Sequence, residues 1–304
     1  MHLFDITLKA GLGQLGNTVW TPGRHLLEDI LDQLRGCELV VPQLDELMTN
    51  SAIEGIEKYV ERYRENRLFG DRRSLIAEYR RVWNLMRYAL AETPQMALGY
   101  IHWVTTKDET NAANRLSQRL GLKRIKNALE EFGSRGDTLH PKIACLLDVL
   151  RQTAGQKVIV LCTTKVGAAE LAATVTSRSP FVHKAIQLHR GVKKFEKQFA
   201  AFSEAGNGVA VATATLGRNV GIVADTVVYY NLLSPDPAHI REFAPLPRLQ
   251  SVLVAIDHQL DLGRGYYQPN VRPRIRGIVP SRRRRKSPDT LTPVLPFGEV
   301  TPRT

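Results

Sequence analysis

Three short apolar runs limit what this chain can fold into. Residues 157–162 (Lys-Val-Ile-Val-Leu-Cys), 208–212 (Gly-Val-Ala-Val-Ala) and 226–230 (Thr-Val-Val-Tyr-Tyr) are continuously apolar or nearly so, and rich in β-branched residues. Such runs are typical of strands that are buried on both faces. Helical patterns over 166–175 and 188–202 separate the first two runs. The pattern therefore predicts an α/β unit whose parallel strands are joined by helical crossovers.

Threonine and glycine follow two of these strands. Thr163 and Thr164 come after the first, and a glycine-bearing turn over 213–222 comes after the second. The carboxyl ends of parallel strands meet at one edge of a sheet, where ligands of such folds bind, and amides and hydroxyls there suit phosphate oxygens. The alternative is that these residues only make the turns, because Thr and Gly are common turn and cap residues.

The first 150 residues are mainly helical in pattern. Apolar residues recur at helical spacing over 22–34, 53–63, 73–92, 95–104, 111–120, 123–132 and 143–151. Strand patterns precede and interrupt this block at 2–10 and 38–41. The segment 11–18 matches GxGxxG and nearly matches a P-loop, but Asn17 stands where the P-loop lysine is needed. We expect a flexible glycine loop there, with a helix beginning at Pro22.

Aromatic and basic side chains of the helical block allow two interpretations each. Trp83 and Trp103 either pack inside the block or stack on nucleobases. Arginines concentrated between Arg62 and Arg81 alternate with Glu and Asp, which favours a salt-bridged surface over a phosphate-binding groove.

Composition excludes several classes of protein. The chain has 304 residues, 43% of them hydrophobic, which is enough for two unequal cores. No apolar run is long enough to cross a membrane, so we expect no membrane partner. The three cysteines are far apart, which argues against a disulfide framework or a metal site and favours a cytoplasmic location, near the nucleoid if the source is prokaryotic.

The net charge of +12 is concentrated at the carboxyl terminus. Residues 263–304 hold ten Lys and Arg against two Asp and Glu, and so account for +8. The segment is rich in proline and is predicted to be a disordered basic tail. Its basic run consists of Arg282, Arg283, Arg284, Arg285 and Lys286. Nucleic-acid binding and a solubilising or targeting role explain this run equally well.

The order of the motifs resembles a known family. A His140-Pro141-Lys142 turn, the strand 157–164, Leu-His-Arg-Gly at 188–191, Val-Ala-Val-Ala-Thr at 209–213 and Val-Val-Tyr-Tyr-Asn at 227–231 follow one another. This arrangement is similar to the second RecA-like lobe of superfamily 2 helicases, in the Hef/FANCM branch, where a helical domain is inserted between two motor lobes.

The resemblance implies an α/β fold with a single RecA-like parallel-sheet lobe, an inserted or preceding all-helical domain and a basic tail. The corresponding parts are a strand and loop that pack on the lobe (1–21), the helical domain (22–136), the RecA-like lobe (137–262) and the tail (263–304). It also implies contacts to the phosphates of one strand. The candidates are Thr163, Thr164, Thr213 and Thr215, with nearby positive charge from Arg190, Lys193, Lys194, Lys197 and Arg218. The lysines at 193, 194 and 197 are equally consistent with a solvated helix face.

The chain departs from the family at the ATPase machinery. The glycines after Thr213 are displaced, the acidic residue that should follow them is missing, and only Arg241 or Arg248 is left as a possible arginine finger. The first lobe, with its P-loop lysine and metal-binding carboxylates, is absent. We therefore expect no catalytic residues and no cofactor, because phosphoryl transfer needs these parts together.

Three functions are compatible with this reading. The first is an ATPase-inactive nucleic-acid-binding or adaptor protein that acts on branched or single-stranded DNA in repair or fork processing, with a nuclease or sliding clamp as partner. The second is a split helicase subunit that becomes an ATPase when another chain supplies the P-loop lobe. The third is an interaction module whose former DNA surface is inert.

Overall fold

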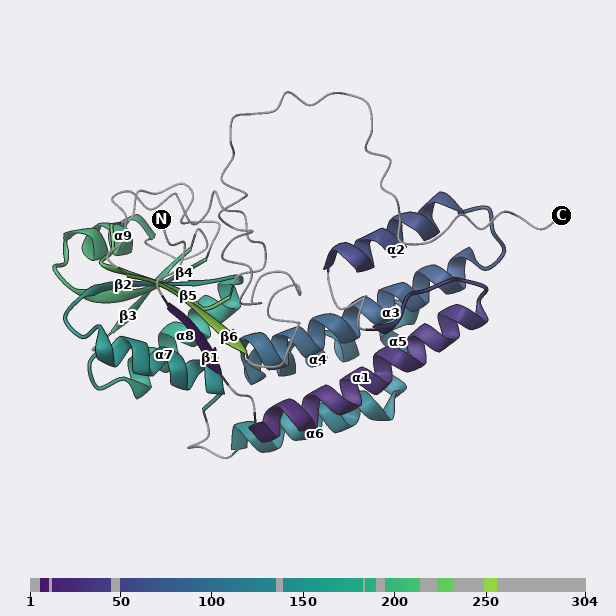
Figure 1. Cartoon of the computed structure of the whole chain (residues 1–304), viewed down its shortest axis with the longest axis horizontal. Coiled ribbons are helices and arrows are strands. Elements are labelled where there is room, and N and C mark those ends of the chain that lie inside the picture. The colour runs from purple at the N-terminus through teal and green to yellow at the C-terminus, as the bar shows by residue number, and fades with distance from the viewer. Residues whose placement is uncertain are drawn as a thin grey trace, which may run out of the picture.

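A computed structural model describes residues 6–10, 13–44, 50–134, 139–182, 184–189, 195–213, 223–231 and 249–255. Figure 1 shows two parts, a lobe built on a β-sheet and an elongated helical arm beside it. The arm lies beyond the carboxyl ends of the strands. The basic tail and the predicted turn over 214–222 lie outside the described residues.

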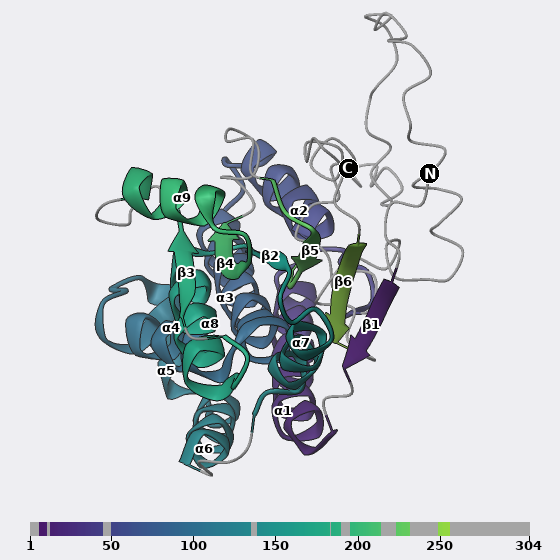
Figure 2. The ribbon, with the colours of Figure 1, turned by 90° about the vertical axis from the view of Figure 1, so that its left-hand side faces the viewer.

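The sheet has six strands in the order β1-β6-β5-β2-β4-β3, and every neighbouring pair is parallel (Figure 2). The strands are β1 (Ile6–Ala10), β2 (Lys157–Cys162), β3 (Ala185–Leu188), β4 (Gly208–Thr213), β5 (Thr226–Tyr229) and β6 (Leu249–Ala255). The described side chains of β2, β4 and β5 are almost all buried, as their apolar runs predict.

Helices cover both faces of the sheet. Figure 1 places α7 (Pro141–Gln152) and α8 (Lys165–Arg178) on one face and α9 (Phe195–Glu204) on the other. Apolar side chains of α7 and α8 share one core with every second residue of β2, including Val158 and Val160. From α9, Phe202 is fully buried.

The helical arm has a core of its own. It is built from α1 (Gly13–Gly36), α2 (Asn50–Arg62), α3 (Phe69–Arg87), the π-helical turn η2 (Tyr88–Glu92), α4 (Pro94–Thr106), α5 (Asn111–Gln118) and α6 (Leu120–Ser134). The strand before the arm, β1, pairs with β6, and α7 after the arm packs near both. The helical region is therefore an insertion within the sheet lobe.

Predictions for one helix and three strands were wrong or incomplete. Within the helix expected over 188–202, the structure describes α9 from Phe195 onward, whereas Leu188 ends strand β3, which the sequence pattern did not reveal; residues 190–194 lie outside the described residues. Strand β6 was also missed. Residues 38–41 form no strand; Glu38 has a left-handed backbone with φ of +58°, which interrupts an extended run, and its carbonyl oxygen accepts Arg72 Nη2 at 3.1 Å.

The expected glycine loop is largely helix. Helix α1 begins at Gly13, which has φ of +54°, and continues through Pro22 to Gly36. Leu15 and Val19 are buried on the same face as Leu26, so core packing continues the helix toward the amino terminus. The missing N–H of Pro22 would have bonded to the carbonyl of Thr18, and this one lost bond is tolerated.

In the part of the chain that the structure describes, no helix is long and apolar enough to cross a membrane. The same residues contain no cluster of three His, Cys, Asp or Glu side chains that could hold a metal ion.

Candidate nucleic-acid interface

The polar ends of two adjacent strands meet at the carboxyl edge of the sheet. In the parallel ladder Cys162 of β2 is the register partner of Thr213 of β4. The two threonines that follow Cys162 therefore lie close to Thr213, as the strand pattern predicts. Thr213 is buried, whereas Thr163 and Thr164 are half-buried.

The hydroxyls of Thr163 and Thr164 already have partners within the chain. Thr163 Oγ1 donates a hydrogen bond of 2.6 Å to Glu92 Oε1 of the helical arm. Thr164 is the N-cap of α8, and its Oγ1 accepts the amide of Gly167 at 2.9 Å. A phosphate that used the Thr163 hydroxyl would therefore have to displace Glu92.

Positive charge at this edge comes from Lys165, which sequence reasoning missed. Its side chain is exposed in the first turn of α8, directly after the two threonines. Burial, together with the nearby charge of Lys165, lowers the pKa of His189, which follows β3 at the same edge. The imidazole is therefore neutral at physiological pH, and Lys165 carries the charge.

Lys197 is an exposed residue in the first turn of α9. Because α9 connects the carboxyl end of β3 to the amino end of β4, its first turn lies toward the carboxyl edge. The other candidates, Arg190, Lys193, Lys194, Thr215, Arg218, Arg282, Arg283, Arg284, Arg285 and Lys286, lie outside the described residues, as do Arg241 and Arg248.

The turn η2 joins the arm to this edge through its backbone. The carbonyl of Ala91 accepts Lys142 Nζ at 2.9 Å and Asn231 Nδ2 at 2.8 Å. The carbonyl of Glu92 accepts the hydroxyl of Tyr230 at 2.9 Å. Thr93, which follows η2, is extended and ends the run of helical hydrogen bonds. The last carbonyls of the turn therefore have no partner within the helix, and the side chains of the lobe donate hydrogen bonds to them.

The side chains of this junction are charged and buried. Glu92 Oε1 lies 3.6 Å from Arg87 Nη1, and both side chains are almost completely enclosed. Lys142 is fully buried, with Nζ 4.7 Å from the centre of the Tyr230 ring. Thr93 donates a hydrogen bond to Glu170 of α8. We call these contacts between the arm and the lobe the junction cluster.

Two residues of the lobe that contact η2, Lys142 and Asn231, belong to motifs that the sequence analysis had identified. Lys142 belongs to the His-Pro-Lys turn and Asn231 ends the Val-Val-Tyr-Tyr-Asn run. Their role was missed because a sequence pattern does not show that a carbonyl 51 or 140 residues away is the partner.

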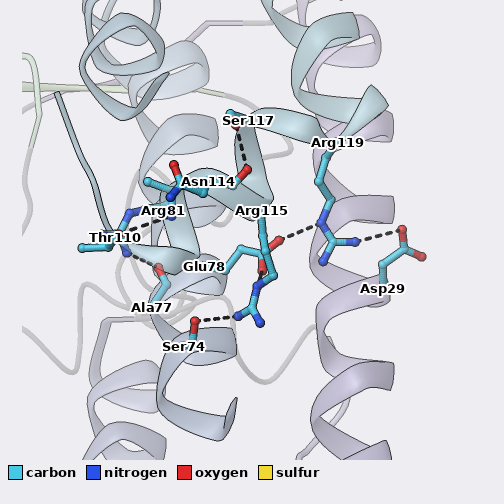
Figure 3. Close-up of polar contacts among 11 residues, drawn as sticks. Asp29, Ser74, Ala77, Glu78, Arg81, Thr110, Asn114, Arg115, Ser117 and Arg119 are labelled. Carbon is cyan, nitrogen blue, oxygen red and sulfur yellow. Dashed lines mark hydrogen bonds and ion pairs between the residues drawn. The ribbon is translucent and has the colours of Figure 1, made fainter. Parts of the chain in front are cut away.

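The arginines of the helical arm are used mainly inside the arm. Arg80 binds Glu57 through two bonds of 2.6 Å, and Arg81 Nε donates to Asp108 at 2.8 Å. Figure 3 shows a second group, in which Arg115 and Arg119 both point to the fully buried Glu78, at 3.2 and 2.7 Å. The expected ion pairs are present, but those of Arg81 and Glu78 are enclosed rather than solvated. Because these arginines are paired inside the arm, the carboxyl edge is the better candidate for a phosphate contact.

Solved structures with a similar fold include parts of helicase and ATPase domains. The helicase domain of Hef from Pyrococcus furiosus superposes with a TM-score of 0.64 at 17% identity, over 84% of this chain and 56% of the Hef chain. The chain thus spans little more than half of that domain. The match to the C-terminal part of the Fun30 ATPase domain has a TM-score of 0.48 at 11% identity, and it covers 91% of this chain and 97% of the Fun30 chain. The match to the C-terminal domain of the Sulfolobus solfataricus SWI2/SNF2 ATPase has a TM-score of 0.44 at 8% identity, and it covers 83% of this chain and 79% of the ATPase chain.

No protein-family model matches the sequence, and the search of curated proteins found no match. The chain shares its fold, a RecA-like lobe with a helical region, with part of the Hef helicase domain, as the sequence resemblance implied.

Proposed function

We propose that this chain is an ATPase-inactive, helicase-derived protein that binds branched or single-stranded DNA and serves as an adaptor in repair or fork processing. The observation that carries the proposal is the carboxyl edge, where Thr163 and Thr213 lie at adjacent strand ends and the exposed Lys165 begins the helix that follows β2. Amides, hydroxyls and a lysine there suit the phosphates of a nucleic-acid strand. A nuclease or sliding clamp is the kind of protein partner that such an adaptor would deliver.

The proposal predicts salt-dependent binding. Purified full-length protein should bind single-stranded and forked DNA in a fluorescence anisotropy assay, with an affinity that falls steeply as salt rises. Replacing Lys165 with Ala should weaken binding to all sequences and make the salt dependence shallower by about one unit of slope. Lys58→Ala, which changes an exposed lysine of α2, is the matched control and should bind as the wild type.

The contribution of the basic tail is tested by a separate variant in the same assay. Replacing Arg282, Arg283, Arg284, Arg285 and Lys286 with serine in the full chain removes five charges and leaves the sheet intact. If this variant loses all binding while Lys165→Ala has no effect, the tail alone holds DNA and the carboxyl edge does not. An affinity unchanged between low and moderate salt would argue against phosphate contacts altogether.

The second candidate is a split helicase subunit. The helicase-like fold and the parallel order of its strands favour it, and it predicts a separate chain with a P-loop lobe. On this candidate the chain alone should not hydrolyse ATP, because no P-loop lysine is recognised in its sequence and phosphoryl transfer needs a phosphate cradle and metal carboxylates together. DNA-stimulated hydrolysis that appears only when a P-loop partner is added would establish this candidate in place of the first.

A further inference from the structure

Three aromatic rings form a ladder that begins in η2 and continues along α4. The ring centroids of Tyr88 and Tyr100 lie 5.2 Å apart in an edge-to-face arrangement. Those of Tyr100 and Trp103 lie 5.8 Å apart, with their planes inclined by only 23°. Tyr88 and Tyr100 are half-buried, whereas Trp103 keeps 46% of its surface exposed. The outer ring of this aromatic ladder is therefore accessible to a ligand.

The ladder continues the surface of the carboxyl edge. Met96, Tyr100 and Trp103 are spaced by four and three residues, so they lie on one stripe of α4. Met96 Sδ lies 3.5 Å from Thr164 Oγ1, at the end of β2. Trp103 is seven residues further along the helix, or about 10 Å at the α-helical rise. A strand held at the threonines can reach the ladder within a few nucleotides.

Core packing does not account for Trp103. Trp83 of α3 is only 4% exposed and belongs to the core of the arm, whereas Trp103 belongs to neither of the two cores of the described residues. The two tryptophans that the sequence left as either core or stacking residues therefore differ. An exposed, flat ring held parallel to a second ring is a surface that suits a planar ligand.

The charges beside the ladder are largely paired, because Arg81 and Asp108, which both influence Tyr100, form an ion pair of 2.6 Å. The guanidinium of Arg87 lies 4.8 Å from the centre of the Tyr88 ring. Burial raises the pKa of Tyr100 to about 12, so its phenol is uncharged at neutral pH. Lys107, exposed at the carboxyl end of α4, adds positive charge.

We infer that the aromatic ladder is a base-stacking platform for single-stranded nucleic acid, with the exposed face of Trp103 as the stacking surface for a base of the strand held at Thr163, Thr164 and Lys165. The inference rests on the proposed function and specifies its substrate. Every base has a π-face, so stacking on Trp103 is independent of sequence. Bases inside a duplex are covered by their neighbours, so the ladder selects single strands and the open arms of forks.

The test compares three labelled ligands with the full-length protein: oligo(dT), an abasic oligonucleotide of the same length and a duplex. The wild type should bind oligo(dT) about tenfold more tightly than the abasic strand, which keeps the phosphates and lacks the bases. Trp103→Ala should lower the affinity for oligo(dT) by about five- to a hundredfold, the range measured for loss of one stacked base. Its affinity for the abasic strand and the duplex should not change, and Trp103→Phe should restore most of the binding.

The matched control is Tyr63→Ala. Tyr63 is 53% exposed and its ring lies 4.9 Å from that of Tyr59, but it lies at the end of α2, away from the sheet. Its loss should leave all three affinities unchanged. Urea unfolding of both variants verifies that they are folded.

The outcomes separate the inference from the proposed function. Normal binding of oligo(dT) by Trp103→Ala, or equal binding of the abasic strand by the wild type, overturns the inference and leaves the proposed function standing. Binding of no nucleic acid at all overturns both. A Trp103→Ala variant that binds DNA normally but changes the elution volume in size-exclusion chromatography would show that the ladder is a protein contact, which also overturns the inference.

Discussion

Close packing at single residues holds the helices of the arm together. A Cβ atom at Gly121 of α6 would lie 2.6 Å from Leu26 Cγ of α1, so only glycine fits there without a shift of the leucine. By contrast, nothing lies within 4 Å of a Cβ at Gly99 of α4. The two glycines therefore have opposite roles although both are in helices.

Replacing Gly121 with Ala should lower the free energy of unfolding by about 1–3 kcal/mol, because the added methyl group overpacks the contact between α1 and α6. Gly99→Ala is the control, and it should be neutral or raise stability by about 0.5–1 kcal/mol through better helix propensity. Urea titration followed by circular dichroism measures both. Equal effects of the two substitutions would contradict the packing explanation.

The buried carboxylate of Glu78 gives a second prediction at this scale. Glu78 is 0% exposed and neutralised by Arg115 and Arg119 (Figure 3). Glu78→Ala should cost about 3 kcal/mol of stability, since it leaves two arginines that are partly enclosed without their acceptor. The exposed pair of Arg35 with Asp32 is the comparison. Asp32→Ala should change stability by less than about 1 kcal/mol, and a similar loss for both variants would count against a special role of Glu78.

At the scale of the element, capping residues determine where helices begin. Thr93, Thr110 and Thr164 accept backbone amides at the first turns of α4, α5 and α8. His140 does the same for α7, because its Nδ1 accepts the amide of Lys142 at 3.2 Å. A histidine cap must be neutral at Nδ1 to accept this bond, so α7 is sensitive to pH.

Burial, with a smaller effect from Lys142, lowers the pKa of His140 to about 3. The unfolded chain has a histidine pKa near 6.5 and so binds a proton that the folded chain excludes. The stabilising effect of the neutral histidine is complete above pH 6.5 and is lost as pH falls toward 3. We expect the free energy of unfolding to fall by roughly 1.4 kcal/mol per pH unit below pH 6.5 from this group.

The matched variant is His140→Asn, which keeps a capping acceptor and removes the titration. Its stability should depend less on pH than that of the wild type between pH 6.5 and 4, measured by urea unfolding at each pH. Parallel curves for the two proteins would show that His140 titrates normally in the folded state.

At the scale of the whole molecule, the junction cluster connects the helical arm to the sheet lobe. Glu92 and Thr163, 71 residues apart in sequence, belong to different parts and bond directly. A double-mutant cycle with Glu92→Ala and Thr163→Ala should show a coupling energy of about 1–2 kcal/mol, because Glu92 is buried and Thr163 is half-buried. The exposed pair of Arg24 and Glu28 should show less than about 0.5 kcal/mol.

A coupling near zero between Glu92 and Thr163 would mean that their hydrogen bond adds nothing to stability, because water replaces it equally well. The carboxyl edge would then be open to a phosphate at no cost. A large coupling means instead that a phosphate must compete with Glu92 for Thr163, so DNA binding and the attachment of the arm would be linked.

Long helices of the arm were predicted well, because their buried faces repeat over many residues. The helix expected over 95–104, for example, spans Pro94–Thr106, and that over 123–132 spans Leu120–Ser134. Strand β3 was missed since its four residues carry no strong pattern and become a strand only through pairing with β4. In the candidate site, Thr163, Thr164 and Thr213 were named from sequence, whereas Lys165 and Glu92 were not.

The amino-acid sequence by itself determined the helical periodicity, the buried parallel strands and the polar ends of β2 and β4, because these depend on local spacing and on hydrophobicity. Only the tertiary structure decided which distant groups meet: Lys142 with the carbonyl of Ala91, Glu92 with Thr163, and β1 with β6 across the whole inserted arm. Those contacts join residues that are far apart in the chain, and such a contact leaves no period in the sequence.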